Sequence, residues 1–345
     1  MNWNFKNPKQ YKKACLKQAK NTMWIKIFIK KIKEKIEPKK IKPKIYFYHD
    51  KSLLSIKKLP KNINDFNRWF NDLTEKWGPY CWILQTYLRL REVGFPCELT
   101  EKIPDEGIIV IFKRSFPINL KTNKLLVVCV QADKKEYLPA NIYVVQNPSG
   151  PAIRKRKGYF IPLWPQIGLI PRDSGREDKF ENILFCGWKK SLAPELKSPE
   201  FQKKLSELGI SFDKRFENKT YLWKDYSKVD VVLAIRSFDG NKYDYKPATK
   251  LYNAWVAGVP AILGSESAYQ AERKTKLDYI EVKSVKGVIK AIKKLKENKK
   301  FKRAIVKNGF ERAKKISPDK ITERWKKFFL NTAIPEYHRK YKKLA

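Results

Sequence analysis

Residues 244–264 read Asp244-Tyr245-Lys246-Pro247-Ala248-Thr249-Lys250-Leu251-Tyr252-Asn253-Ala254-Trp255-Val256-Ala257-Gly258-Val259-Pro260-Ala261-Ile262-Leu263-Gly264. This order of residues predicts a loop, a short helix, a Gly-Val-Pro break and a buried strand in immediate succession. Pro247 suits the position just ahead of a helix because it has no backbone N–H to leave unpaired. Thr249 is expected to cap the helix, and Gly258 is expected to end it in the left-handed conformation.

The start of this helix is expected to attract an anion. The first N–H groups of a helix have no partner within it, and the helix dipole places partial positive charge there. Lys246 and Lys250 add two full charges beside that end. These features predict a phosphate ligand, although a crossover helix with solvated lysines would look the same in sequence.

The chain beyond residue 180 alternates strands and helices, which predicts a doubly wound parallel sheet. Strands are expected at 183–187, 210–212, 231–235, 260–263 and 279–282, and helices at 199–208, 250–257, 267–275 and 284–297. Ligands of such sheets bind beyond the carboxyl ends of the strands. This rule brings to one rim the residues Gly187, Trp188, Lys189, Arg236, Ser237, Lys246, Pro247, Ala248, Thr249 and Lys250.

Three of these residues have chemistry that suits a nucleotide. Gly187 lets the backbone approach a ligand, Arg236 can hold a phosphate through a two-pronged hydrogen bond, and Trp188 can stack on a base. The structural alternative is that Trp188 covers the edge of the sheet and that Arg236 forms a surface ion pair.

Residues 44–146 are predicted to form a separate α/β unit. Residues 45–50 read as a strand that ends in His49 and Asp50, helices are expected at 65–76 and 79–93, and buried strands are expected at 108–112, 125–130 and 142–145. Residues 147–180 are rich in proline and turn residues, so they are expected to connect the two units.

The chain has 345 residues and a formal net charge of +41, from 76 Lys and Arg against 35 Asp and Glu. The length suits two domains, and 42% hydrophobic residues suffice for a packed core in each. Residues 1–45 hold 15 basic and 2 acidic side chains, and residues 283–345 hold 22 and 5, so most of the excess lies at the two ends. Such a field predicts anionic partners.

Residues 1–43 form a basic N-terminal extension, in which an amphipathic helix is expected at 16–36. Ile25, Phe28 and Ile32 lie at helical spacing among many lysines. This pattern is typical of a helix that lies on an anionic membrane surface, and equally of a helix packed on its own domain. Because the whole chain is cationic, we favour the helix on the membrane surface.

The cysteines are five, and they are widely spaced without a C-x-x-C pair: Cys15, Cys81, Cys97, Cys129 and Cys186. This spacing predicts neither a disulfide framework nor a zinc site, and no metal or cofactor is expected. Reduced thiols, the lack of a signal-peptide pattern and the lack of a long apolar stretch indicate a cytoplasmic protein. If residues 16–36 bind lipid, it would lie at the inner face of the membrane.

The segment Lys250-Leu251-Tyr252-Asn253-Ala254-Trp255-Val256-Ala257-Gly258-Val259-Pro260 resembles the donor-binding segment of GT-B glycosyltransferases of the group 1 type, written K-L-x-E-A-x-A-x-G-x-P. In those enzymes the acidic residue holds the ribose hydroxyls of a nucleotide sugar. Asn253 stands at that position in this chain, so an uncharged amide replaces the carboxylate.

The resemblance implies a GT-B-like fold of the α/β class, with two Rossmann-like domains whose parallel sheets face a central cleft. Residues 44–146 would be the acceptor-side domain and residues 181–318 the nucleotide-sugar-binding domain, where the resemblance is strongest. Residues 319–345 would form the basic terminal helix that crosses back to the first domain.

The function implied by the resemblance is transfer of a sugar, hexosyltransferase-like, from a nucleotide-sugar donor to a glycan or lipid-linked acceptor. The sequence has no D-x-D triplet, so a metal-independent reaction is expected, in which Lys246, Lys250 and Arg236 stabilise the departing diphosphate. His49, next to Asp50, is the candidate base of an inverting enzyme. A retaining enzyme needs no side-chain base, and a structural histidine paired with a neighbour is the alternative.

Two other functions remain open at this point. A nucleotide-sugar epimerase on the same fold would need acids and bases in the cleft, and the sequence does not identify them. A nucleic-acid-binding protein would use the basic charge and the aromatic residues of the chain. The charge lies at the two ends and is not interleaved with aromatic residues, which argues against nucleic acid as a partner.

Overall fold

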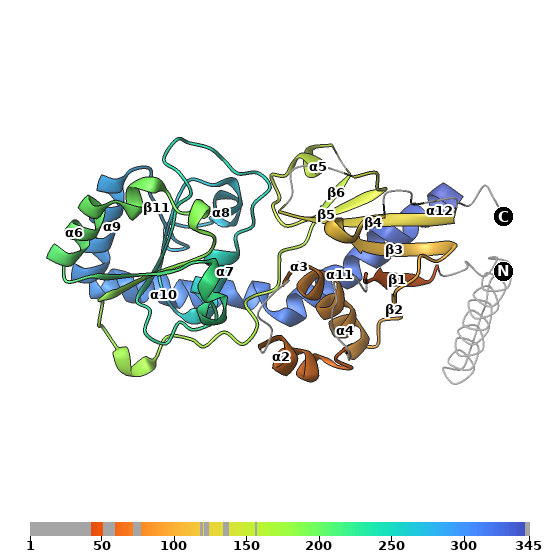
Figure 1. Cartoon of the computed structure of the whole chain (residues 1–345), viewed down its shortest axis with the longest axis horizontal. Helices are drawn as coiled ribbons and strands as arrows, with labels where there is room; N and C mark the ends of the chain where they lie inside the picture. Colours follow the sequence, from red (N-terminus) through yellow and green to blue (C-terminus); the bar gives the residue numbers. More distant parts are fainter. Residues whose placement is uncertain are drawn as a thin grey trace, which may run out of the picture. The chain divides into compact units, whose positions relative to one another are not determined.

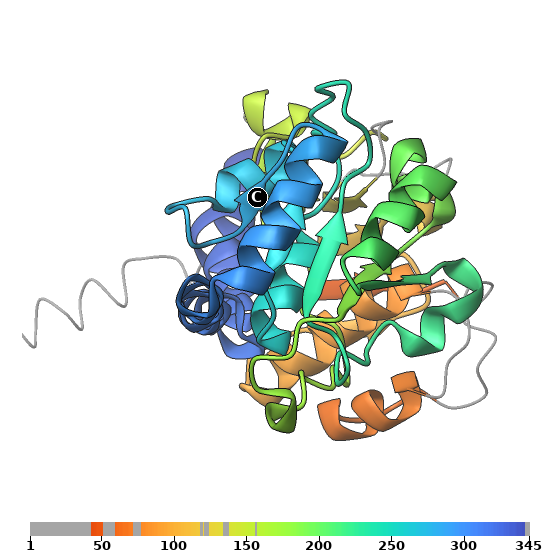
Figure 2. The same cartoon turned by 90° about the vertical axis from the view of Figure 1, so that its left-hand side faces the viewer.

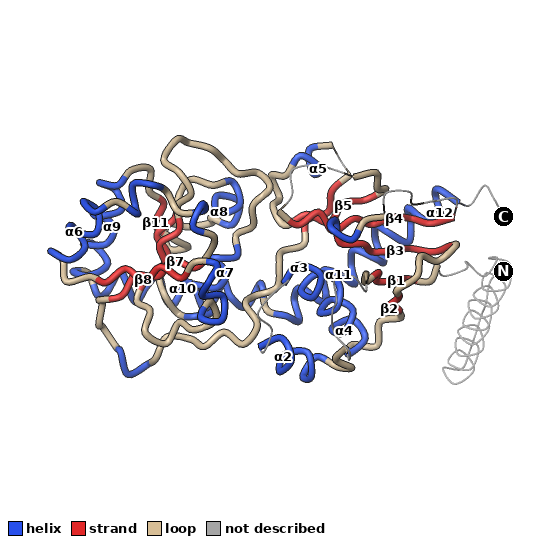
Figure 3. The backbone as a smooth tube through the Cα atoms, in the orientation of Figure 1, coloured by secondary structure: helices blue, strands red, loops and turns tan. Residues whose placement is uncertain are grey.

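The computed structural model describes residues 43–50, 59–71, 77–117, 120, 124–133, 138–155 and 157–341. The described part is built on two parallel sheets with helices around them (Figures 1 and 3). This confirms the predicted α/β class, with a parallel-stranded sheet in each half. The amphipathic helix predicted at 16–36 lies outside the described residues.

The first sheet has the strand order β2-β1-β3-β4-β5-β6, and every neighbouring pair is parallel. Its strands are β1 (Ile45–Tyr48), β2 (Glu98–Thr100), β3 (Glu106–Phe112), β4 (Lys124–Ala132), β5 (Ile142–Val145) and β6 (Gly158–Phe160). Strands β3 and β4 are buried on both faces, as their continuous apolar sequences indicate.

The first sheet continues past residue 146, into the segment that we expected to be a connection. Helix α5 (Pro151–Arg154) turns the chain back, and β6 then pairs with β5. The sequence does not predict this strand, because it has only three residues and follows a cluster of turn residues. The proline-rich part that begins after Phe160 contains no strand, apart from an isolated bridge between Ile170 and Asp225.

Helices α2 (Ile63–Asn71), α3 (Trp77–Pro79) and α4 (Gln85–Glu92) belong to the first half, and a π-helical turn at Tyr80–Leu84 joins the last two. The predicted helix at 79–93 is therefore present with one widened turn. Residues 72–76 of the other predicted helix lie outside the described ranges.

The second sheet has the order β11-β10-β9-β7-β8 and is also parallel, with helices on both of its faces (Figure 2). Its strands are β7 (Asn182–Cys186), β8 (Ser211–Arg215), β9 (Val231–Ala234), β10 (Ala261–Leu263) and β11 (Ile280–Glu281). Its helices are α6 (Pro199–Glu207), α7 (Thr249–Ala257), α8 (Ser267–Glu272) and α9 (Val285–Glu297). The predicted alternation of strands and helices in this half is confirmed.

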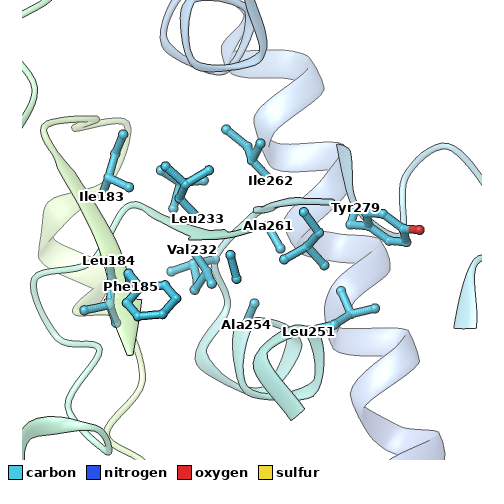
Figure 4. Close-up of a cluster of buried hydrophobic side chains, with 14 of the residues drawn as sticks. Ile183, Leu184, Phe185, Val232, Leu233, Leu251, Ala254, Ala261, Ile262 and Tyr279 are labelled. Atoms are coloured by element: carbon cyan, nitrogen blue, oxygen red, sulfur yellow. The ribbon is translucent and has the colours of Figure 1, made fainter. Parts of the chain in front are cut away.

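The core of the second half forms where α7 packs on the sheet (Figure 4). Leu251 and Ala254 of α7 belong to the same buried cluster as Phe185 of β7 and Val232 of β9. Helix α10 (Lys299–Ala313) packs on the outer side of α7. Burial of this apolar face holds a helix of nine residues, which would be marginal by itself.

The last helices, α11 (Pro318–Phe328) and α12 (Ile334–Tyr341), pack on the first sheet. The Trp325 ring is fully buried, with its centroid 6.2 Å from that of Phe47 in β1. The Tyr341 hydroxyl donates a hydrogen bond of 2.6 Å to the Leu125 carbonyl of β4. The chain thus returns to the first sheet after completing the second.

The two ends of α7 differ in how well the sequence predicts them. Gly258 ends the helix with φ 72° and ψ 36°, the left-handed conformation that we expected. The prediction that Thr249 caps the helix is wrong. The N-cap is Ala248 and Thr249 is already helical, so the start of α7 has no side-chain cap.

Replacing Gly258 by alanine should destabilise the protein for two reasons. An L-residue at φ 72° costs about 1–2 kcal/mol, and the new Cβ would lie 2.6 Å from Cζ of Phe310, which must move. Gly240→Ala is the matched control, because Gly240 has φ 80° with nothing within 4 Å. Thermal unfolding should show a larger drop in Tm for Gly258→Ala, and equal drops would contradict the packing argument.

Candidate functional site

The order of strands in the second sheet marks one place on its carboxyl edge. The chain runs from β7 to β8 on one side, and then returns to β9 on the other side of β7. In open parallel sheets, ligands bind at the point where the strand order reverses in this way. Gly187 follows β7 directly and Arg236 lies two residues beyond β9, so the predicted rim lies at this switch point.

Arg236 and Glu266 form a buried ion pair at this edge, between Nη1 and Oε2. Their side chains are only 10% and 4% exposed. Burial raises the pKa of Glu266, although the nearby charges of Arg236 and Lys250 oppose that shift. The Tyr269 side chain of α8 lies beside both members of the pair. Arg236 is therefore fixed by an internal carboxylate and is not the surface ion pair that we considered.

Lys250 lies in the first turn of α7, close to the same pair. Its Nζ is 3.3 Å from the point where a Cβ would stand on Gly187, and 5.5 Å from the ring centroid of Phe185. Burial, and then the charge of Arg236, lower the pKa of Lys250 from 10.5 to about 7. Gly187, with φ 150°, leaves room for this amine, because a Cβ at that position would lie close to it.

We call Arg236, Lys250 and Glu266 the charge cluster. Within the part of the chain that the structure describes, Nε of Arg236, Oε1 of Glu266 and Oγ1 of Thr249 are buried without a hydrogen-bond partner. A buried polar atom that stays unpaired costs about 1–3 kcal/mol. With two cations and one carboxylate, the charge cluster has a net positive charge when Lys250 is protonated, and such a charge favours an anion.

The loop before α7 is held by residues that follow strands of the first sheet. Asn147, next but one after β5, donates from Nδ2 to the Lys246 carbonyl at 3.0 Å and to Ser267 Oγ at 2.9 Å. Asp133, just after β4, pairs with Lys246 through Oδ2 and Nζ at 2.7 Å. The carboxyl-end residues of one sheet thus fix the backbone beside the carboxyl-end residues of the other.

Ser237 has a local role in the same loop. Its Oγ lies 2.8 Å from the Tyr243 hydroxyl and 2.5 Å from Oδ1 of Asp239. Tyr243 adopts φ 49°, an uncommon value for a residue other than glycine, and its ring lies 5.6 Å from the Arg236 guanidinium. Ser237 therefore shapes the turn that carries Tyr243 to Arg236.

The other residues predicted for the rim are differently placed. Trp188 is 57% exposed, and Lys189 next to it is exposed while its backbone N–H donates to Oε2 of Glu217 at 2.8 Å. Asn253 is buried, and its Oδ1 accepts from the Gln166 backbone N–H at 3.2 Å. The oxygen that we expected to meet a ribose is thus bonded to the segment that joins the two sheets.

Pro247 and Ala248 lead directly into α7, and Ala248 is buried at its N-cap. Their role at the rim is to set the course of the backbone into α7.

His49 and Asp50 follow β1, at the carboxyl edge of the first sheet. His49 is 6% exposed, and its Nε2 lies 3.5 Å from Oε1 of Glu101. The order β2-β1-β3 reverses the direction of the chain at β1, so His49 lies at the switch point of this sheet. The structure places it on the same edge as Asp133 and Asn147.

Glu266, Tyr269, Asn147 and Asp133 were missed by the sequence reasoning. The signal for Glu266 was present, because Gly264-Ser265-Glu266 comes directly after the strand predicted at 260–263. A phosphate site is expected to hold cations, so the acidic residue was not predicted as part of it. Asn147 and Asp133 follow predicted strands as well, but their contacts with Lys246 depend on tertiary structure.

A separate hollow of about 530 Å³ lies at the opposite, amino edge of the second sheet, where Asp230 precedes β9 and Pro260 precedes β10. Arg172, Lys302 and Arg303 in its wall each pair with an aspartate of the same wall. Nη2 of Arg172 lies 2.9 Å from Oδ1 of Asp230, and Lys302 donates to the Asp178 carbonyl at 2.7 Å. Residues of α10 and of the segment before β7 line this hollow.

Among the residues in the described ranges, no three or more His, Cys, Asp or Glu gather as metal ligands would. No helix within those ranges has the length and apolar character needed to span a bilayer.

Solved structures with a similar course of the chain include sucrose-phosphate synthase from Thermosynechococcus elongatus, at 13% identity and TM-score 0.44 over 79% of this chain and 80% of that one. HepE from Anabaena in complex with UDP matches at 11% identity and TM-score 0.45, over 84% and 100%. TarM matches at 10% identity and TM-score 0.46, over 71% and 58%, a little more than half of its length. No protein-family model and no curated protein sequence matches the chain.

The pKa of Lys250 can be measured by NMR on protein with labelled lysine side chains. Comparison with Lys250→Met assigns its signal, which should titrate near pH 7. Glu266→Gln removes a charge that raises this pKa and should lower it further, whereas Arg236→Gln should raise it. A Lys250 signal that titrates near 10.5, or shifts of the same sign in both variants, would contradict the proposed contacts.

Proposed function

We propose that the chain is a glycosyltransferase that takes a sugar from a nucleotide-sugar donor held at the carboxyl edge of the second sheet. The observation that carries this proposal is the charge cluster, buried at the switch point beside the start of α7. Two cations with a single internal carboxylate leave one positive charge unbalanced when Lys250 is protonated. The negatively charged oxygens of a diphosphate would balance it.

The donor diphosphate would lie between Gly187, Lys250 and the uncapped start of α7. The free N–H groups at that end and the Thr249 hydroxyl would donate hydrogen bonds to its oxygens. Nε of Arg236 is a further unused donor, while Glu266 keeps the guanidinium in place. Trp188, which is exposed just after Gly187, is the candidate for stacking on the base.

The transfer step breaks the bond between the anomeric carbon and the phosphate oxygen, and the electron pair leaves with the diphosphate. The acceptor hydroxyl oxygen bonds to the anomeric carbon and loses its proton. Lys250 and Arg236 would stabilise the charge that develops on the diphosphate, a role that needs no metal ion. We expect Lys250 to be protonated when the diphosphate is bound, because an adjacent anion raises the pKa of an amine.

The acceptor would approach from the first sheet, where His49 lies at the carboxyl edge. Glu101 beside it would hold the ring and stabilise a protonated imidazole, as a general base requires. A glycan or a lipid-linked sugar is the acceptor class we propose. Asp133 and Asn147 both bond to Lys246. They would hold the loop before α7 in a fixed position relative to that edge.

Lys250→Met should lower the rate of donor cleavage about a hundredfold or more, because removal of one preorganised group that stabilises a developing charge commonly lowers kcat by that factor. Nucleotide-sugar hydrolysis without acceptor, tested with UDP-, GDP-, ADP- and CMP-sugars, is the readout. Lys250→Arg keeps the charge and should retain more activity. Lys228→Met, at an exposed lysine before β9, is the control and should match the unaltered protein. Unchanged hydrolysis in Lys250→Met would remove this residue from the site.

His49→Gln should separate transfer from donor binding. If His49 takes the acceptor proton, the variant should lose about a hundredfold in kcat of transfer while the Kd of the donor stays the same. The two values come from an acceptor assay and from calorimetry. A change in Kd alone, or no change in kcat, would contradict the role of His49 as the base.

A further inference from the structure

We propose that the outer face of α9 and the start of α10 bind the anionic headgroups of a lipid membrane. We call this surface the lysine face, and it comprises Lys283, Lys286, Lys290, Lys293, Lys294 and Lys300. The proposal rests on the charge and placement of these residues and is independent of the transferase activity.

The charge of this surface is almost entirely of one sign. Residues 283–300 hold eight lysines and a single acidic residue, Glu297, and all eight lysines are exposed. Three of them contact other parts of the chain. Lys296 donates to the Leu208 carbonyl, Nζ of Lys299 lies 3.7 Å from Asp178, and Nζ of Lys294 lies 4.0 Å from the ring centroid of Phe301 in α10. The six of the lysine face make no ion pair with any carboxylate in the part of the chain that is described.

Helix α9 directs these charges away from the protein. Its buried side, Val288, Ala291, Ile292 and Leu295, packs into the core of the second half. Lys286, Lys290 and Lys293 follow one another at spacings of four and three residues, so they share the opposite side. Helix α9 lies towards the viewer in Figure 2, at the surface of the second half.

The surface is hollowed where α9 meets the start of α10. The hollow has a volume of about 950 Å³. Five lysines, Lys286, Lys290, Lys293, Lys294 and Lys299, line it together with Asn298, the half-buried Ile289 and a single carboxylate, Glu297. Several ammonium groups around one open hollow suit a phosphate headgroup, which offers several acceptor oxygens. The aliphatic part of these side chains also suits the boundary between headgroups and acyl chains.

The composition of the surface favours lipid over nucleic acid. Four to eight lysines on an amphipathic helix are the pattern that binds anionic lipid. Single-stranded nucleic acid also needs aromatic surfaces on which its bases stack. The exposed large apolar residues in the described ranges, such as Trp188, Tyr221 and Phe310, all lie outside 283–300.

The test is co-sedimentation of the full chain with vesicles of phosphatidylcholine alone, or mixed with phosphatidylglycerol. The triple variant Lys286→Gln, Lys290→Gln, Lys293→Gln should bind the mixed vesicles about a hundredfold more weakly, because each lysine near such a surface contributes about fivefold. Added salt should weaken binding of the unaltered protein. Neither protein should bind phosphatidylcholine alone.

The matched control is Lys203→Gln, Lys204→Gln, Lys228→Gln, which removes three exposed lysines elsewhere and gives the same net charge. Both triple variants keep residues 1–42, so any contribution of that extension is the same in both. A loss of lipid binding confined to the α9 variant supports the proposal. Equal losses in both, or no loss in either, would overturn it.

Two further arms of the experiment distinguish other ligands. If the α9 variant loses binding to single-stranded DNA but keeps binding to the mixed vesicles, the surface is a nucleic-acid site and the proposal is wrong. Inorganic phosphate, compared with sodium chloride at equal ionic strength, should displace the protein from vesicles no more strongly than the chloride. Stronger displacement by phosphate would identify a site for free phosphate and overturn the lipid assignment.

Discussion

The buried ion pair between Arg236 and Glu266 is the constraint on which the candidate site depends. Removing one partner of a buried pair typically costs about 3–5 kcal/mol, because the other charge is left without compensation. The pair fixes Arg236 at the end of β9, and its charge, together with burial, lowers the pKa of Lys250 to about 7. An anion placed beside Lys250 would raise this pKa and favour the protonated amine.

The fold explains why these groups meet. In each sheet the strand order reverses at the strand that comes first in the sequence, β1 in the first sheet and β7 in the second. His49 and Gly187 follow these strands, so each lies at the carboxyl edge of its sheet. The buried polar residues of the first sheet gather at the same edge, among them His49, Gln131, Gln146 and Asn147. Asn147 then bonds to the loop that leads to α7, so a residue that follows the first sheet positions the loop beside the charge cluster of the second.

Local signals predicted most of the fold and only part of the site. The apolar runs, the pattern around Gly258 and the carboxyl-end rule predicted the second sheet, α7 and the place of Arg236 and Lys250. Thr249 failed as a cap because the chain enters the helix one residue earlier, and β6 was too short to be recognised. Asn253 and Lys246 bond to Gln166 and Asp133, far away in sequence, and such partners follow from tertiary packing that no local pattern contains.

The most direct test is a crystal structure of the protein with a bound nucleotide sugar, since the second sheet offers two different places for an anion. We predict that the diphosphate lies at the carboxyl edge, within hydrogen-bond distance of Lys250 Nζ and of the first backbone N–H groups of α7. A nucleotide bound instead in the hollow at the amino edge, between Arg172 and Lys302, with the charge cluster empty, would contradict the account.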